Sequence, residues 1–382
     1  MKIGIPKETA RGETRVALIP SLIPMLKKEQ HQVCVQKEAG VAASYSDEEY
    51  LGAGAVIVND ARTLYEGSDV VVKVRPPSSE EAQMMKEGAG YLGFFAPLVH
   101  PDVVAVFLRR RITGFSVEYI PRITRAQSMD ALSSMATVAG YKAVVIAAEK
   151  MVKMFPLMMT AAGTIPPAIV LVLGAGVAGL QAIATARRLG AKVEAFDPRP
   201  AVKEQVKSLG ASFIDMELAE DVETADGYAK EQSEYYLKKE REVIAARLPN
   251  TDAVICTAQV FGKRAPVLLT TDMLMLLRPG AVVVDLASEQ GGNCELTMPD
   301  ATVERNGISI IGAVNLPATV PAHASQMYAK NVTNLFLHLY PNGAATPDFE
   351  DEITKGCCIT HNGAILHQAV KTAIDHKGVT AK

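Results

Sequence analysis

The chain has 382 residues, of which 48% are hydrophobic and 21% charged, and its formal net charge is −3. This length predicts two domains, and the composition is that of an ordinary globular protein without disordered tracts. The small negative charge argues against nucleic acid as a partner, and the odd set of five irregularly spaced cysteines indicates a reducing compartment.

The first third of the chain alternates short apolar runs with helical patterns, which is typical of βαβ units and a parallel sheet. The first turn, residues 7–15, lacks the glycine pattern that cradles phosphate, so this domain is expected to be doubly wound without an evident nucleotide site. Arg15 and Lys73 fall at strand ends, where they could hold a carboxylate or be solvated charges. Strands are expected at 2–6, 32–36, 55–58, 70–74, 90–95 and 113–118, and helices at 19–29 and 101–110.

A polar segment, residues 122–130, precedes a long helical pattern that is expected to bridge the two domains. Arg122, Gln127, Asp130 and Ser133 offer a guanidinium, an amide, a carboxylate and a hydroxyl that could converge on a small polar group such as a carboxamide. The alternative is helix capping, with Ser128 as the N-cap and Asp130 as a first-turn acid.

The strongest motif is a strand-like run at 170–173 that leads into Gly-x-Gly-x-x-Gly and then into a helical pattern. Gly174 suits the tight turn, Gly176 the backbone approach to a pyrophosphate, and Gly179 close packing of helix on strand. A second strand ends at Asp197, where an acid accepts from the adenosine ribose 2′-OH; this favours NAD, although Arg199 could clamp a 2′-phosphate. The chain is therefore predicted to bind a dinucleotide.

The rest of the second domain continues the alternation, with strands expected at 192–196, 212–215, 253–257, 281–286 and 308–314. The acidic segment 220–230 is either a lid over the ligand, with Tyr228 as its contact, or a plain solvated loop. A helix from about Ser325 is expected to return the chain to the first domain. No apolar stretch long enough to span a membrane is free of Gly or Pro, so a membrane role would come through a partner.

Other chemistry has little support in the sequence. Cys357, Cys358, His361 and His367 lie close together, but their spacing fits no common zinc pattern, so no metal is expected. No hydrolase motif is present.

Several segments carry a family resemblance. They are residues 5–8, 13–17, 121–134, 159–168, 227–230 and 291–294. On these segments the chain resembles the NAD(H)-binding component (domain I, the alpha subunit or its first part) of proton-translocating nicotinamide nucleotide transhydrogenase, in the alanine dehydrogenase/transhydrogenase superfamily. An alanine dehydrogenase would carry a catalytic histidine within 91–96; here that segment has none, and His100 falls several residues late.

The resemblance implies roles for individual residues. Arg122, Gln127, Asp130 and Ser133 would lie at the nicotinamide and its ribose, with Gln127, Asp130 and Arg122 the residues most directly concerned with catalysis. The pyrophosphate would meet Gly174, Gly176, Val177 and Gly179, and the adenosine ribose Asp197 and Arg199. Gly227 and Tyr228 would belong to a loop that closes on the nucleotide.

The resemblance also implies an activity: an NAD(P)+ transhydrogenase of the Si–Re, proton-translocating type. Hydride would pass from NADH to NADP+ on an NADP(H)-binding partner subunit, and a membrane-spanning proton-channel subunit would couple the transfer to proton movement. Ring-to-ring transfer moves no proton at the reacting carbon, so positioning can replace a general base. The chain would be a homodimer on the cytoplasmic face of the inner membrane. The alternatives are an alanine-dehydrogenase-like amino-acid oxidoreductase and a dinucleotide-sensing module without turnover.

Together these features predict an α/β protein with two doubly wound, Rossmann-like parallel-sheet domains joined by two long helices. The first domain is expected to comprise residues 1–135 and 320–382, and the NAD(H)-binding domain residues 136–319.

Overall fold

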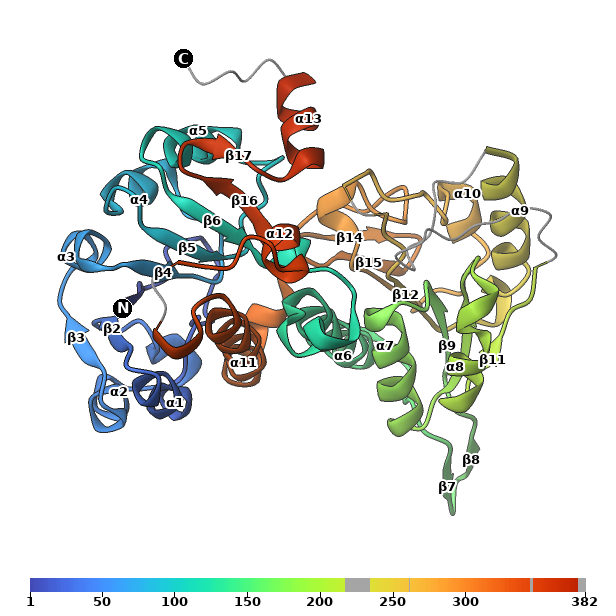
Figure 1. The fold of residues 1–382 in the computed structure, drawn as a ribbon. Helices are drawn as coiled ribbons and strands as arrows, with labels where there is room; N and C mark the ends of the chain where they lie inside the picture. Colours follow the sequence, from blue (N-terminus) through green and yellow to red (C-terminus); the bar gives the residue numbers. More distant parts are fainter. Residues whose placement is uncertain (217–233, 261, 344–345, 377–382) are drawn as a thin grey trace. The chain divides into compact units, whose positions relative to one another are not determined.

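A computed structural model describes residues 1–216, 234–260, 262–343 and 346–376. The chain divides into two compact units, Met1–Met135 with Pro317–Lys382 (unit 1) and Ala136–Leu316 (unit 2). Each unit is built on one parallel-dominated sheet flanked by helices, which confirms the predicted α/β class (Figure 1).

The sheet of unit 1 has the strand order β3-β2-β1-β4-β5-β6 at its parallel core. This is the doubly wound order, in which the chain reverses direction between β1 and β4. Two further strands extend the sheet at β6, where β16 runs antiparallel. The strands are β1 Lys2–Ile5, β2 Gln32–Gln36, β3 Val56–Val58, β4 Val70–Val72, β5 Gly90–Gly93, β6 Thr113–Ser116, β16 Cys358–His361 and β17 Ala364–Ile365.

The helices of unit 1 begin where the sequence supplies caps. Ser46 and Ser78 each form a capping box with the glutamate three residues later, which satisfies the exposed N–H groups of the first turn. The helices are α1 Ile23–Lys28, α2 Asp47–Ala53, α3 Ala61–Gly67, α4 Ser79–Met84, α5 Pro101–Arg109, α11 Pro321–Leu339, α12 Glu352–Cys357 and α13 Gln368–His376. A 3₁₀ helix, η4 (Thr124–Met129), lies before α6.

Unit 2 repeats the same order, β11-β10-β9-β12-β13-β15, with β14 antiparallel at one edge. Its reversal point lies between β9 and β12. The strands are β9 Ile169–Leu173, β10 Lys192–Phe196, β11 Ser212–Phe213, β12 Ala253–Cys256, β13 Val282–Asp285, β14 Thr302–Arg305 and β15 Ile308–Gly312, and the helices are α7 Val177–Arg188, α8 Lys203–Ser208, α9 Glu234–Ala245 and α10 Thr271–Leu274. The central strands are buried on both faces, as parallel strands covered by helices must be.

Helix α6 (Ala131–Lys150) begins in unit 1 and continues into unit 2, and the chain returns to unit 1 at Pro317, just before α11. Helix α6 is long and apolar enough to cross a membrane, and 39% of its most apolar stretch is buried inside the protein. The core helix of a globular protein can have the same length and composition, and Ala143, Val144 and Ala147 of α6 pack into the core of unit 2.

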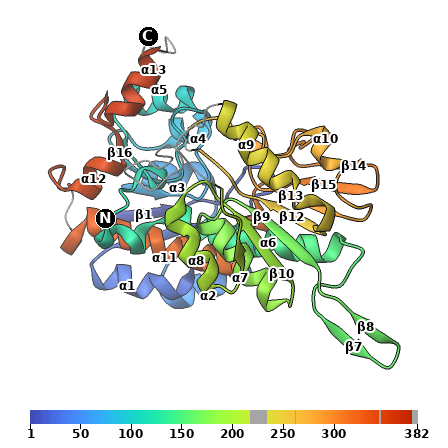
Figure 2. The same ribbon diagram turned by 90° about the vertical axis from the view of Figure 1, so that its right-hand side faces the viewer.

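A two-stranded hairpin, β7 (Met158–Thr160) and β8 (Gly163–Ile165), projects from unit 2 (Figures 1 and 2). The elements expected from the sequence include no strand in this region. Apolar side chains on and beside the hairpin are exposed, with Met159 at 78% and Leu157 at 54%.

Candidate functional site

The polar residues predicted to converge in unit 1 line one cavity of about 320 Å³. The cavity is lined by Pro121, Arg122, Ile123, Ala126, Gln127, Asp130 and Ser133. The 3₁₀ turn makes this possible, because Ala126 and Met129 are buried while Arg122 and Gln127 stay exposed. A guanidinium, an amide, a carboxylate and a hydroxyl therefore line one hollow.

Asp130 also caps helix α6. Its Oδ1 accepts a hydrogen bond from the Ser133 backbone N–H at 2.9 Å, and its Oδ2 accepts from the Ser133 hydroxyl at 2.5 Å. Ser128, the N-cap expected from the sequence, lies two residues too early for this role. Asp130 thus both caps α6 and lines the cavity. The capping hydrogen bonds fix the direction of its carboxylate.

In unit 2 the glycine turn joins β9 to α7 at the reversal point of the sheet. Gly174 has a φ of +94°, and a Cβ at Gly179 would lie 1.9 Å from the Gly174 carbonyl oxygen. Both positions therefore require glycine, one for the turn and the other for close packing. Gly176 differs, since nothing lies within 4 Å of the place where its Cβ would be.

The first turn of α7 suits a phosphate group. Gly176 is the N-cap, no side chain caps the helix, and the first turn carries no acidic residue. Val177 is the first helical residue and is partly exposed. Backbone N–H groups beside open space at a helix N-terminus are the features that bind a dinucleotide pyrophosphate, so these residues fit the expected ligand.

Asp197 lies at the end of β10 and ties the glycine turn to the next loop. Its carboxylate accepts from the Ala175 N–H at 2.7 Å and pairs with the Arg199 guanidinium at 2.8 and 2.9 Å. Asp197 is only 5% exposed. An Arg199 held by a carboxylate is a poor clamp for a 2′-phosphate, because the phosphate would have to displace Asp197.

Several supports of the turn were missed by the sequence interpretation. Thr257 donates from its hydroxyl to the Gly174 carbonyl at 2.9 Å. Asn293 donates to the carbonyls of Ala258 and Pro266 at 2.8 Å, and the backbone N–H of Asn293 donates to buried Asp285 at 2.7 Å. The only available signal was the Gly-Gly-Asn-Cys segment at 291–294, which carried the family resemblance without a physical role.

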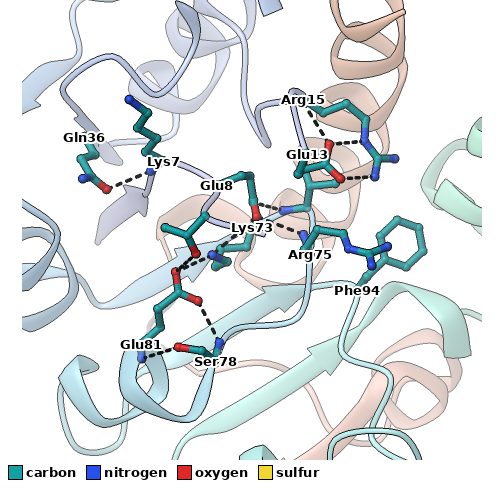
Figure 3. Close-up of polar contacts among 12 residues, drawn as sticks. Lys7, Glu8, Glu13, Arg15, Gln36, Lys73, Arg75, Ser78, Glu81 and Phe94 are labelled. Atoms are coloured by element: carbon teal, nitrogen blue, oxygen red, sulfur yellow. Dashed lines mark hydrogen bonds and ion pairs between the residues drawn. The ribbon is translucent and has the colours of Figure 1, made fainter. Parts of the chain in front are cut away.

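The reversal point of unit 1 is closed by internal ion pairs (Figure 3). Arg15 pairs with Glu13 at 2.6 Å, and Lys73 lies 2.9 Å from Glu81 and 3.5 Å from Glu8. Arg15 and Lys73 are 4% and 1% exposed, so the alternative that they are solvated is wrong. The carboxylates that Arg15 and Lys73 contact are side chains of the same protein, Glu8, Glu13 and Glu81.

The pKa values within this cluster move in opposite directions. Burial raises the pKa of Glu8 above its ordinary value, although the Lys73 charge acts against it. Burial also opposes ionisation of Glu81, but the Lys73 ammonium and its hydrogen bond lower the pKa of Glu81. Glu81 is therefore the ionised partner of Lys73.

Two other expectations have different outcomes. Gly227 and Tyr228, the proposed closing loop, lie outside the described residues. Within the described ranges no group of three or more His, Cys, Asp or Glu side chains could hold a metal ion. Cys357 and Cys358 are buried, and His361 packs against Phe349 and contacts the Thr113 hydroxyl.

Comparison with known proteins places the chain in a family. The model for Alanine dehydrogenase/PNT, N-terminal domain, matches residues 4–139, and that for Alanine dehydrogenase/PNT, C-terminal domain, matches residues 143–368. The first part of the NAD(P) transhydrogenase alpha subunit of Rhodospirillum rubrum is 46% identical over 379 residues, which cover 97% of this chain and 99% of that protein.

Solved structures agree with these matches. The transhydrogenase from Sinorhizobium meliloti is 40% identical, with a TM-score of 0.84, and the match covers 97% of this chain and 100% of that one. An L-alanine dehydrogenase at 24% identity shares the fold, with a TM-score of 0.83 and full coverage of both chains. The resemblance inferred from the sequence is confirmed, and the chain belongs to the Alanine dehydrogenase/PNT family.

Proposed function

We propose that this chain is the NAD(H)-binding component of a proton-translocating NAD(P) transhydrogenase of the Si–Re type. It would hold NAD(H) for direct hydride exchange with NADP(H) on a partner subunit, while a membrane-spanning subunit couples the exchange to proton movement. The observation that carries the proposal is the cavity lined by Arg122, Gln127, Asp130 and Ser133, because no histidine is among its described lining residues. Similarity to the Rhodospirillum rubrum subunit supports the same assignment.

The absence of a histidine among the described lining residues of the cavity matches the chemistry of this reaction. Oxidising an amine releases a proton as well as a hydride, so such a site needs a general base. Transfer between two nicotinamide rings needs alignment and exclusion of water instead. Arg122, Gln127 and Asp130 would orient the carboxamide and ribose, and Ser133 would complete the polar lining.

The segment 91–96 further disfavours an amino-acid dehydrogenase. Ala96, the last residue of the segment in which a histidine would be expected, has a left-handed φ of 44°. The Glu118 carboxylate accepts from the N–H groups of Phe95 and Ala96 at 2.9 to 3.1 Å. His100 lies at the start of α5. The described residues of this segment thus offer a fixed backbone and no imidazole.

The dinucleotide's other groups would bind in unit 2. Gly174, Gly176, Val177 and Gly179 would hold the pyrophosphate, and Asp197 with Arg199 the adenosine ribose. The Asp197–Arg199 pair favours NAD(H) over its 2′-phosphorylated form. Gly227 and Tyr228 are proposed to close on the bound nucleotide.

The β7–β8 hairpin supports the homodimer. Projecting apolar side chains such as Met159 and Leu157 are costly to leave in water and mark contact surfaces. We assign them to a second copy of the chain. The assembled protein would lie at the cytoplasmic face of the inner membrane, held there by its partner subunits.

A binding and turnover assay tests the function. NADH fluorescence should report binding to the purified chain alone, and hydride transfer to NADP+ should appear only after the NADP(H)-binding component is added. Alanine with NAD+ should give no NADH. Turnover with alanine would instead favour the alanine-dehydrogenase-like alternative, and binding without transfer in the presence of the partner would favour a dinucleotide sensor.

A further inference from the structure

The cavity-lining segment 122–130 is anchored by a residue far away in the sequence. The Arg125 guanidinium lies 2.7 Å from the Asp351 carboxylate. Asp351 is the N-cap of α12, where its Oδ1 accepts from the Ile353 and Thr354 N–H groups at 2.8 and 3.2 Å. The same oxygen lies 2.9 Å from His338 Nε2 on α11. One carboxylate therefore connects the segment with α11 and α12.

Asp351 is ionised in this arrangement. Its burial opposes ionisation, but hydrogen bonds from His338 and Arg125 and from the backbone of α12 lower the pKa of Asp351 well below its ordinary value. An ionised carboxylate only accepts hydrogen bonds, so His338 carries a hydrogen on Nε2 and donates it. A charge-assisted contact of this kind is stronger than a neutral one.

A second anchor lies three residues further along the segment. The Ser128 carbonyl accepts from Asn331 Nδ2 at 3.0 Å and from Asn334 Nδ2 at 3.1 Å, both on α11. The anchors at Arg125 and Ser128 flank Gln127, and Arg122 and Asp130 lie just outside them. Residues that line the cavity thus alternate along the segment with the two anchored residues, Arg125 and Ser128.

We propose that Asp351 is a positioning residue for the cavity: through Arg125 it sets the placement of Arg122, Gln127 and Asp130 without touching the substrate. The inference rests on the proposed function, in which alignment takes the place of acid–base chemistry. A displacement of about 1 Å costs roughly a hundredfold in rate when positioning dominates, so a weakened anchor acts on transfer more than on binding.

The test replaces Asp351 by asparagine. Asparagine is as good an N-cap as aspartate, so Asp351→Asn keeps α12 capped and removes only the charge that holds Arg125 and His338. Hydrogen exchange of the free chain should become about 3- to 10-fold faster in residues 121–130 and stay unchanged in α12. With the NADP(H)-binding component present, kcat for hydride transfer should fall about 5- to 50-fold, while the Kd for NADH changes less than about twofold.

Three further variants make the result specific. Arg125→Gln removes the same contact from the other side and should match Asp351→Asn, and the double variant should be no slower than the slower single variant. Lys355→Gln is the matched control, because it removes an exposed 2.8 Å ion pair with Glu350 from the same region and should change neither readout.

The possible outcomes are distinct. Exchange and transfer that are both unchanged in Asp351→Asn would overturn the inference, as would additive losses in the double variant. Parallel loss of NADH binding and transfer would make Asp351 a general stability residue instead. If the wild-type chain transfers no hydride with its partner, the proposed function fails, and the exchange measurement still decides whether Asp351 orders the segment.

Discussion

Replacing Glu240 by glutamine should remove a pH-dependent weakness of unit 2. Tyr236, Glu240 and Ile244 form the buried stripe of α9, and Ile244 shares a core with Phe196, the residue before Asp197. Glu240 is 2% exposed, and its Oε1 is buried and has no hydrogen-bond partner among the described residues. Burial, together with the nearby negative charge of Asp197, raises the pKa of Glu240 to about 7 from 4.5.

The sign and size of the effect follow from this pKa. As the pH rises from 4.5 towards 7, the unfolded chain releases the proton while folded unit 2 retains it, so stability is lost over this window. Each pH unit within it is about 1.4 kcal/mol, which gives a loss of about 3 kcal/mol. Glutamine is neutral throughout, so Glu240→Gln should avoid the loss.

Thermal unfolding at about pH 5 and about pH 8 measures the difference. The advantage of Glu240→Gln over wild type should grow by about 2 to 3 kcal/mol between these conditions, or roughly 4 to 12 °C for a domain of this size. Glu242→Gln is the control on the same helix, because Glu242 is exposed and pairs with Lys239 at the surface. A Glu240→Gln variant that follows wild type at both pH values would refute the reasoning.

Three other outcomes are expected. Gln127→Asn should slow hydride transfer far more than it weakens NADH binding, and equal losses in kcat and Kd would remove its alignment role. Gly176→Ala should fold normally but bind NADH at least about tenfold more weakly. Gly179→Ala should lower the melting temperature, because its methyl group meets the Gly174 carbonyl. Circular dichroism and NADH titration distinguish the two variants. Met159→Asp should shift the proposed dimer towards monomer in analytical ultracentrifugation while NADH binding persists, and an unchanged sedimentation coefficient would contradict the assigned contact.

Local patterns in the sequence were sufficient to predict the parallel strands at the centre of both sheets. The strands at 32–36 and 192–196 have the expected bounds, because runs of alternating or continuous apolar residues end at clear turn residues. The glycine turn was equally predictable, since Gly174 and Gly179 meet local steric demands and Gly176 leaves open space at the start of α7. Convergence of Arg122, Gln127, Asp130 and Ser133 on one cavity followed from their closeness along the chain.

Long-range pairing could not be read in the same way. The antiparallel strands β16 and β14 join their sheets at edges, where side-chain periodicity carries little information. The contact of Arg125 with Asp351 joins distant segments whose charges are unremarkable in isolation. Arg15 and Lys73 were ambiguous for a different reason. Their partners Glu13 and Glu81 are close along the chain, but the sequence does not show that these four side chains are buried.

The sealed reversal point of unit 1 has a consequence for proton uptake. Two cations, Arg15 and Lys73, share the interior with three carboxyl groups, those of Glu8, Glu13 and Glu81. Burial raises the pKa of Glu8 above its ordinary value, so folded unit 1 holds a proton on this group more tightly than the unfolded chain does. Folding of unit 1 is therefore coupled to proton binding at Glu8, and raising the pH from the ordinary pKa of a glutamate through the folded pKa of Glu8 works against it.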